Sequence, residues 1–278
     1  MRTFKSSRLL VVTPTLGNSE FLDRSIESVM SLGLDIVHVL SVPEGKRTEL
    51  QARYPHAIVV NDAGKRQGLY GALNSALKSC PEPWDWFTYI NDDDRLLPGF
   101  ADAFDKHVSA TRPEPVMYGN VDLIDETDRV IASITSESNP AWIPALLQQG
   151  ISPLSQQGNT FSREAVQKVR GFDPGYRLCG DLDFWVRVYA HGFSFKHYKM
   201  RVGQFRLRKG QLSSNTRLTL CEQAEIVRLN FPLVVSPIKR QIAKLRYRVN
   251  NLPKYIMRLR VQGFKTSHQM LGSETVSK

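Results

Sequence analysis

The order of apolar and amphipathic segments in the first part of the chain restricts its fold more than any other feature. Short apolar, β-branched runs at residues 8–13, 35–40 and 57–60 are typical of buried strands. The stretches between them, residues 19–33 and 46–54, have the periodicity of helices. Strand, helix, strand, helix, strand predicts a mostly parallel α/β sheet, in which ligands bind beyond the carboxyl ends of the strands.

A cluster of three carboxylates follows the next apolar run. Residues 86–90 have the composition of a buried strand, and residues 91–94 read Asn-Asp-Asp-Asp. Such a cluster can hold a divalent cation through hard oxygen ligands, or it can be a solvated turn before a helix. These residues alone leave both interpretations open. The cluster is expected at the same edge of the sheet as the loop at residues 14–18.

The remainder of residues 1–231 is predicted to add antiparallel strands, which makes the sheet mixed. Helices are expected at residues 68–78, 100–108, 142–149 and 163–169, and strands at residues 116–120, 121–124, 129–134 and 158–161. The turn after the first strand lacks the G-x-G-x-x-G pattern of a dinucleotide site, and the sequence has no Walker pattern. These absences argue against a nicotinamide enzyme and a P-loop enzyme.

A second informative segment surrounds Asp181. Leu182, Trp185, Val186 and Tyr189 are spaced to share one face of a helix, so Asp181 lies at or beside its start. An Asp in this position can cap the helix, because its oxygens accept backbone N–H bonds and complement the helix dipole. A carboxylate held there can also be a general base. The two roles are compatible.

The positive charge of the chain is concentrated at its C-terminal end. The formal charge is +10, and residues 232–278 contain ten Lys and Arg against one acid, so they carry +9 of it. A nearly neutral body with a basic tail does not fit a protein that binds nucleic acid along its length. We therefore predict two units, a body at residues 1–231 and a basic amphipathic helical tail at residues 232–278.

The apolar residues of the tail recur at helical spacing. They are Ile238, Ile242, Leu245, Val249, Leu252 and Ile256. Pro253 is expected to kink or split the helix. A basic amphipathic helix can lie on an anionic membrane surface, or it can pack its apolar side against the body and leave its charges in water. We favour the membrane surface as a partner.

Cysteine usage and the absence of long apolar runs predict a cellular location. Cys80, Cys179 and Cys221 are odd in number and widely spaced, which favours a reducing compartment over a disulfide framework or a zinc site. The first apolar run is too short for the core of a signal peptide, and no run approaches the length that spans a bilayer. We expect a cytoplasmic protein, peripheral at the inner face of the cell membrane if the tail binds lipid.

Five segments of the chain form an ordered set of motifs. They are the opening strand LVVTPT (10–15), the helix GLYGALN (68–74), the acidic segment NDDD with Pro98 after it, the strand and turn QGNTFSR (157–163) with GFD (171–173), and GDLDFWVR (180–187). In this order they resemble glycosyltransferase family 2, whose members are inverting enzymes of GT-A fold that use nucleotide-sugar donors. The resemblance extends from about residue 8 to residue 214.

The resemblance implies a role for each matching residue. Asp181 corresponds to the general base, and Mg²⁺ or Mn²⁺ would be held by Asp93 as the leading ligand, with Asp92 and Asp94 beside it. Asp92 could instead lie near the ribose, and Asp94 could serve the start of the next helix. Contacts with the nucleotide-sugar are implied for Pro14, Thr15, Arg66, Gly68, Asn74 and Asp92. Acceptor-side positions are Gln157, Gly180 and Trp185. An Asp of ordinary pKa, about 3.9, is a weak base, so positioning must contribute to catalysis.

The sequence also departs from the family pattern. Residues 40–44 lack the Asp that many members use to contact the nucleotide base, and Arg66-Gln67 replaces an acidic residue before Gly68. Arg208 stands where the late segment F-R-x-H has His. Arginine cannot bind the metal but could contact the diphosphate. These departures leave the donor nucleotide open.

The function predicted is transfer of a sugar from a nucleotide-sugar to a saccharide or lipid-linked acceptor in cell-surface polysaccharide synthesis. The alternative is a non-catalytic GT-A-like scaffold of a polysaccharide assembly complex, which the missing acidic residues would explain. A nucleotidyltransferase would be expected to have a Gly-rich loop with Lys or Arg after the first strand, and residues 14–18 do not form one.

Overall fold

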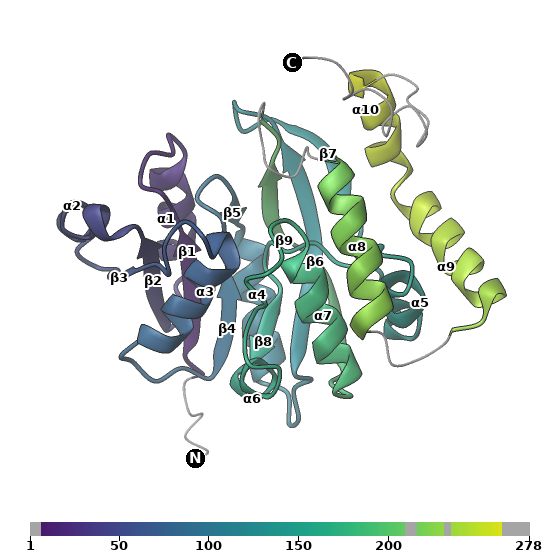
Figure 1. The fold of residues 1–278 in the computed structure, drawn as a ribbon, viewed down its shortest axis with the longest axis horizontal. Helices are drawn as coiled ribbons and strands as arrows, with labels where there is room; N and C mark the ends of the chain where they lie inside the picture. Colours follow the sequence, from purple (N-terminus) through teal and green to yellow (C-terminus); the bar gives the residue numbers. More distant parts are fainter. Residues whose placement is uncertain (1–6, 209–215, 231–234, 263–278) are drawn as a thin grey trace.

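The computed structural model describes residues 7–208, 216–230 and 235–262. Its strands form one mixed sheet in the order β3-β2-β1-β4-β8-β6-β9-β5, and β7 pairs with β6 (Figure 1). The strands are β1 (Leu9–Pro14), β2 (Ile36–Val42), β3 (Ile58–Asn61), β4 (Trp86–Tyr89), β5 (Arg95–Leu96), β6 (Val116–Ile124), β7 (Val130–Ile134), β8 (Thr160–Ser162) and β9 (Phe195–Arg206). Mixed α/β architecture was the prediction, and it is confirmed.

Helices flank both faces of the sheet (Figure 1). They are α1 (Leu22–Met30), α2 (Arg47–Arg53), α3 (Gly68–Ser79), α4 (Pro98–Val108), α5 (Ile143–Leu147), α6 (Arg163–Lys168), α7 (Gly180–Ala190), α8 (Thr216–Asn230), α9 (Pro237–Asn250) and α10 (Leu252–Gln262), with short 3-10 turns at Glu44–Lys46 and Pro140–Trp142. None of the helices in these described ranges is long and apolar enough to cross a membrane.

The parallel half of the sheet, β3-β2-β1-β4, is buried on both faces. Leu10 and Val12 of β1 pack in the core under α3 and α7, whereas Leu9 and Val11 pack in the core under α1 and α4. All four side chains are completely buried. Because helices cover both faces, the positions facing either side of the strand are apolar. The sequence therefore shows a continuous apolar run and not an alternation of apolar and polar residues.

The second half of the sheet differs more from the prediction. β8 pairs antiparallel with both β4 and β6, and β6 continues through the point where two separate strands were expected. The twelve-residue strand β9, its short partner β5 and the helix α8 were not predicted. β9, which lies between β6 and β5, has exposed charged positions at Lys196, Lys199 and Arg201 among buried ones, and this pattern is weaker than a continuous apolar run.

The basic tail forms two helices that pack on the body. α9 contacts α5, and α10 contacts β7. The predicted split is confirmed, since α9 ends at Asn250 and α10 begins at Leu252. Pro253 lies in the first turn of α10, where its missing N–H removes no helical hydrogen bond.

Candidate active site

Two loops meet at the carboxyl ends of β1 and β4. The Thr15 hydroxyl donates a hydrogen bond of 2.6 Å to Oδ2 of Asp92, and Ser19 donates to the Asp92 carbonyl at 3.2 Å. Ser25 of α1 donates to the carbonyl of Asn91 at 3.0 Å. β1 and β4 are adjacent parallel strands, so their carboxyl ends lie at one edge. The predicted juxtaposition of residues 14–18 with the acidic cluster is therefore confirmed.

Asp94 turns into the protein and is completely buried. Its Oδ2 accepts hydrogen bonds from the side chains of Gln157 at 2.7 Å and Asn91 at 3.2 Å, and its Oδ1 accepts the Arg206 N–H at 2.8 Å. Burial raises its pKa, and these three donors oppose the rise. With both oxygens used inside the protein, Asp94 holds the cluster to β9 instead of serving as a metal ligand.

The suggested role of Asp94 at the start of the next helix is wrong. α4 begins at Pro98, Leu97 occupies the capping position, and no side chain caps that end. Pro98 supplies the preset backbone angle of the first helical residue, so this helix needs no Asp to begin. The hydrogen bonds from Gln157, Asn91 and the Arg206 N–H hold Asp94 inward.

Asp93 carries an ion pair that the sequence did not indicate. The Nε of Arg208 lies 2.7 Å from Oδ2 of Asp93, whose side chain is largely buried. The guanidinium thus occupies one oxygen of the leading predicted metal ligand. In the described parts of the chain, no group of three or more His, Cys, Asp or Glu side chains is arranged to hold a metal ion. The three-aspartate ligand set therefore does not fit the arrangement of these side chains.

Arg206 connects the cluster to the β6–β7 hairpin. It is completely buried, and its guanidinium donates to the Asp93 carbonyl at 2.8 Å and to the Asp125 carbonyl at 2.7 Å. It also pairs with Asp128 at 2.5 Å and lies over the ring of Phe21 at 4.1 Å. Arg206 is the Arg of the F-R-x-H segment, but the sequence gave no sign that its side chain is buried and bonds several acidic residues.

Asp181 is in the first turn of α7, and Cys179 occupies the capping position, so the N-cap interpretation is corrected. Its Oδ1 accepts the Leu182 N–H at 2.8 Å. The pKa of Asp181 is raised to about 6, chiefly by burial and further by the charge of Glu222, against the hydrogen bond from Leu182. The side chain keeps some contact with solvent although protein atoms surround it. A carboxylate of this pKa is a stronger base than the unshifted one expected from the sequence.

Glu222 of α8 fixes the segment that precedes Asp181. Its carboxylate accepts the backbone N–H groups of Arg177, Leu178 and Cys179 at 2.8, 2.9 and 2.8 Å. Three donors on one buried carboxylate hold this turn in place. Neither Glu222 nor α8 was predicted from the sequence, and the helix-forming composition of residues 216–230 was the signal available.

Tyr89, the last residue of β4, is buried. Burial raises its pKa, and the negative charges of both Asp181 and Asp94 raise it further. Tyr70 shows the same combination of burial and the Asp181 charge, and its hydroxyl donates to the Leu178 carbonyl at 3.1 Å. Asp181 and the acidic cluster therefore act on the same buried tyrosine at the end of β4.

Asn74 was predicted to contact the nucleotide-sugar, but the structure gives its side chain other partners. Its amide nitrogen donates to the Phe172 carbonyl at 2.7 Å, and its amide oxygen accepts the Phe172 N–H at 2.9 Å. Both polar atoms are thus engaged in holding the turn after α6 against α3. The Asn74 of the helix motif therefore has a structural role in this protein, and it is not among the proposed contacts with the nucleotide-sugar.

The acceptor-side positions also have structural partners. Trp185 is buried in the core at 3% exposure, so its predicted contact with an acceptor is corrected. Gln157 donates to Asp94, as described above. A Cβ on Gly180 would lie 2.6 Å from the Tyr70 ring, so this glycine allows α7 to approach α3. Asp183 forms a buried ion pair of 2.7 Å with Arg187, which makes that pair structural.

The other residues predicted to contact the nucleotide-sugar lie at the carboxyl edge of the parallel strands, as expected. Pro14 is the last residue of β1, and Arg66 and Gly68 are exposed where the chain enters α3 after β3. Gly68 has a φ of +55°, a left-handed conformation that favours glycine. The positions are those of a loop at the carboxyl end of the sheet, and the contacts of these residues with a nucleotide-sugar stay predictions.

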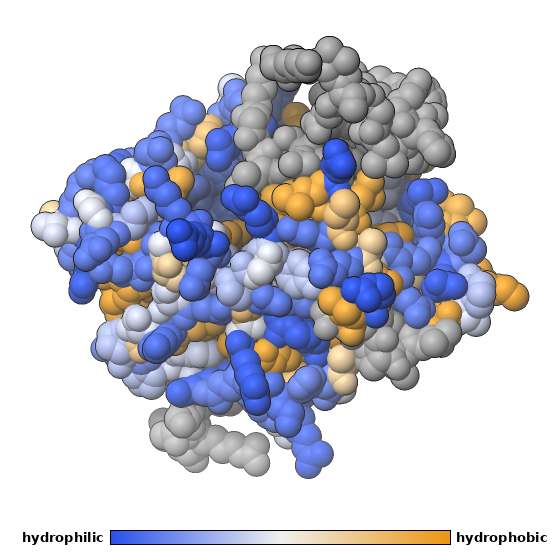
Figure 2. Space-filling model, in the orientation of Figure 1, coloured by the Kyte–Doolittle hydropathy of each residue, from blue (hydrophilic) through white to orange (hydrophobic). Residues whose placement is uncertain are grey.

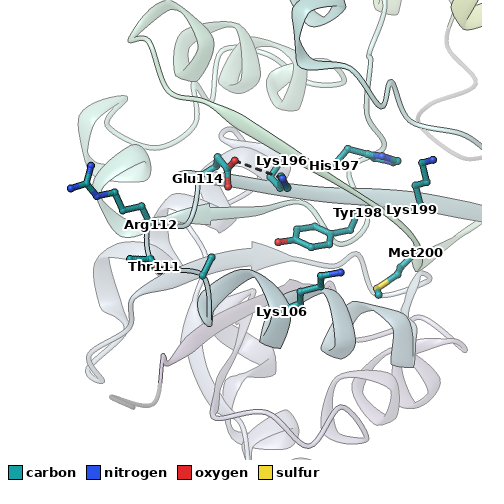
Figure 3. Close-up of a pocket in the computed structure, with 10 residues that line it drawn as sticks. Lys106, Thr111, Arg112, Glu114, Lys196, His197, Tyr198, Lys199 and Met200 are labelled. Carbon is teal, nitrogen blue, oxygen red and sulfur yellow. Dashed lines mark ion pairs between the residues drawn. The ribbon is translucent and has the colours of Figure 1, made fainter. Parts of the chain in front are cut away.

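A separate hollow of about 720 Å³ lies at the opposite end of β9. Figure 3 shows Lys106, Arg112, Lys196 and Lys199 around it, with Glu114 paired to Lys196 at 4.0 Å. It is lined from the end of α4 and the beginning of β9, not by the residues predicted for the site. It therefore plays no part in the arrangement around Asp181.

The fold is shared with proteins of known structure that bind nucleotide-sugars. No protein-family model and no curated protein sequence matches the chain. Residues 1–349 of S. aureus TarS, in complex with UDP, match with a TM-score of 0.59 at 10% identity, over 94% of this chain and 77% of that one. The same TarS segment with UDP-GlcNAc matches with a TM-score of 0.57 at 13% identity, over 92% and 75%.

A mannosyltransferase shares the fold as well. The mannosyltransferase PcManGT from Pyrobaculum calidifontis, in complex with GDP-Man and Mn²⁺, matches with a TM-score of 0.56 at 12% identity, over 95% of this chain and 77% of that one. At these identities the likeness establishes the fold, which is of the GT-A type predicted from the sequence. Activity has to be argued from the site.

Proposed function

We propose that the chain is an inverting glycosyltransferase that moves a sugar from a nucleotide-sugar to a saccharide or lipid-linked acceptor in cell-surface polysaccharide synthesis. The observation that carries the proposal is the pairing of two different carboxylate environments in a GT-A-type fold. Asp92 and Asp93 lie at the end of β4 beside Thr15, and Asp181 lies in the first turn of α7 with its pKa raised to about 6.

Asp181 is the proposed general base. Displacement at the anomeric carbon with inversion requires removal of the acceptor hydroxyl proton on the face away from the nucleotide. A carboxylate whose pKa is closer to neutral takes up that proton more readily than an ordinary Asp. Glu222 fixes the backbone before Asp181, and the Leu182 N–H holds one of its oxygens, so the other oxygen is available for the proton.

Asp92 and Asp93 are the proposed ligands of Mg²⁺ or Mn²⁺. Ions of this kind are commonly held by one or two carboxylates together with substrate phosphate oxygens, so the absence of Asp94 from the set does not exclude such a site. Bound there, the ion would act as a Lewis acid on the diphosphate leaving group. Arg208 holds Asp93 in the structure, and its guanidinium is suited to the diphosphate once Asp93 is otherwise engaged.

The same ion pair is the specific observation in favour of a second candidate, a non-catalytic GT-A-like scaffold. A guanidinium on the leading metal ligand, with Arg66-Gln67 in place of an acidic residue directly before Gly68, would suit a site that no longer binds a nucleotide. Thermal-shift measurements with UDP, GDP, dTDP and CMP sugars, with and without Mn²⁺, separate the two. If the chain is a transferase, sugars of one nucleotide class should raise the melting temperature of the protein, and Mn²⁺ should increase that shift. Absence of any shift across all donors would favour the scaffold.

The rate of transfer should depend on pH through Asp181. Only the ionised carboxylate accepts a proton, so kcat/KM is expected to rise about tenfold per pH unit below pH 6 and to level off above it. Initial rates across the acidic range measure this profile. Glu222→Gln removes a charge that raises the pKa, so its midpoint should move to lower pH. A profile flat from pH 5 to 7 in the wild type contradicts the assignment.

Arg208→Gln should increase the affinity for Mn²⁺ measured in the absence of nucleotide. The Arg208 side chain is partly exposed, and such ion pairs contribute up to about 1 kcal/mol, which corresponds to a gain of up to about fivefold. Titration calorimetry measures the dissociation constant. Arg129→Gln removes an exposed pair with Asp125 and serves as the matched control, which should leave metal affinity unchanged. Equal affinity in wild type and Arg208→Gln would mean that the guanidinium does not compete with the ion.

A further inference from the structure

The tail helices expose an apolar stripe instead of burying it. The side chains involved and their exposed fractions are Ile238 74%, Ile242 49%, Leu245 65%, Val249 62%, Leu252 54% and Ile256 41%. They recur at intervals of four and three residues, so the stripe continues from α9 into α10. Figure 2 shows apolar side chains along the right-hand edge of the molecule, where α9 lies in Figure 1. We call this set the outer stripe.

The body holds these helices by a different face. Ala243 and Asn251 are completely buried and Tyr247 nearly so, and their spacing of four residues places them on one side of the helix. The Asn251 side chain accepts the Thr135 N–H at 2.8 Å and donates to the Thr135 carbonyl at 2.9 Å. Arg246 pairs with the buried Glu137 at 3.2 Å. At about 100° per residue, the outer stripe points away from this docked face.

The surroundings of the outer stripe are positively charged. Residues 231–262 contain no Asp or Glu, and the cationic residues of the described side chains are Lys239, Arg240, Lys244, Arg246, Arg248 and Lys254. On the helical wheel Arg248 lies on one side of the stripe and Lys239 lies on the other, whereas Arg246 is paired with Glu137 of the body. A wide apolar strip flanked by cations is the arrangement of helices that lie in the plane of a membrane interface.

We propose that the outer stripe of α9 and α10 docks on the surface of a bilayer that contains anionic lipids. The aliphatic side chains enter the headgroup region, and the flanking cations pair with lipid phosphates. A second copy of this chain is a poorer occupant. Two stripes packed together would bring rows of Lys and Arg against each other with no acid on the tail helices to compensate.

Docking by the outer stripe also sets the orientation of the candidate site. α10 contacts β7, β7 pairs with β6, and the end of β6 pairs with β9 at Arg206, beside the acidic cluster. Figure 1 shows α10 at the same end of the molecule as the β6–β7 hairpin. Membrane docking by the outer stripe can be tested independently of sugar transfer, because vesicle binding is measured without nucleotide-sugar or acceptor. If both proposals hold, the acceptor is presented at a membrane.

Vesicle flotation of the full-length protein tests the proposal. Phosphatidylcholine vesicles are compared with vesicles that also contain phosphatidylglycerol, at low and high salt. The stripe variant carries Leu245→Ser and Val249→Ser, two exposed positions where loss of folding is not expected, and Met30→Ser on α1 is its exposed control. The charge variant carries Lys239→Gln and Arg248→Gln, with Lys78→Gln and Lys168→Gln as its control.

The wild type should float with the anionic vesicles and bind neutral ones weakly. The stripe variant should lose at least about tenfold in affinity, the charge variant should lose affinity only at low salt, and both controls should bind as the wild type does. Light scattering is run on the same samples. The proposal is overturned if the wild type does not float with anionic vesicles or if the stripe variant floats as well as the wild type. It is also overturned if light scattering shows that the wild type is a dimer and the stripe variant is a monomer.

Discussion

Asp181→Asn should lower kcat for sugar transfer by about 10²- to 10⁴-fold, which is the range of a general-base contribution. The substitution is close to isosteric, and the amide oxygen can still accept the Leu182 N–H that Asp181 accepts at 2.8 Å. The amide cannot take up the acceptor proton at any accessible pH. Binding of the donor should be unchanged, because the base acts on the acceptor. Initial rates and the thermal shift with the donor measure the two effects separately.

Asp183→Asn is the matched comparison within the same helix. Asp183 is buried and pairs with Arg187 at 2.7 Å, so its substitution should reduce stability while the folded fraction keeps a rate near that of the wild type. If Asp181 is the base, the loss of rate occurs at position 181 and the loss of stability at position 183. A rate near the wild-type value for Asp181→Asn would remove this residue as the base.

Arg206→Met should lower the free energy of unfolding by about 3–5 kcal/mol, the range for breaking a buried charge network. Methionine can occupy much of the volume but donates no hydrogen bond. The Asp93 and Asp125 carbonyls would lose their donor, and Asp128 would lose its closest cation. Urea unfolding followed by fluorescence gives the free energy difference, and the slope of the transition shows whether the variant stays two-state.

Arg129→Met is the control for that experiment. Its pair with Asp125 is in the same hairpin, but the Arg129 side chain is 78% exposed, so a change of no more than about 1 kcal/mol is expected. If Arg206→Met proves as mild as Arg129→Met, the guanidinium does not hold the hairpin to the acidic cluster.

The parallel half of the fold was predictable because each of its strands is buried on both faces. Residues 9–12 and 86–89 are nearly all apolar, and such runs identify a central strand without knowledge of its neighbours. Their order along the chain then placed residues 14–18 and the acidic cluster at one edge. The position of Asp181 in a helical first turn followed equally from local periodicity.

The different roles of the three aspartates were not predictable in this way. Asp92, Asp93 and Asp94 are chemically identical in the sequence, and their contacts are decided by residues as distant as Gln157 and Arg206. β9, which supplies Arg206 and leads to Arg208, has irregularly spaced charged residues that gave no strand signal. The substitution of Arg208 for the expected His was noticed, but its ion pair with Asp93 depends on the folded β9.

The tail illustrates a limit of helical periodicity. The spacing of Ile242, Leu245 and Val249 correctly predicts a helix with an apolar side, but it cannot tell which side faces the body. In the structure, Ala243 and Tyr247 make the contact and the apolar side is exposed. Small and aromatic residues beside the polar Asn251 fit the surface of α5 and β7, a match that exists only after the sheet has formed.

Acceptor-free cleavage of the donor tests the central claim most directly. Transferases of this kind are expected to pass the sugar slowly to water, so ¹H NMR recorded soon after mixing can identify the anomer released from the donor selected by thermal shift. The account predicts a free sugar with the anomeric configuration opposite to that in the donor, and no release by Asp181→Asn. Release with the configuration retained, or equal release by Asp181→Asn, would contradict it.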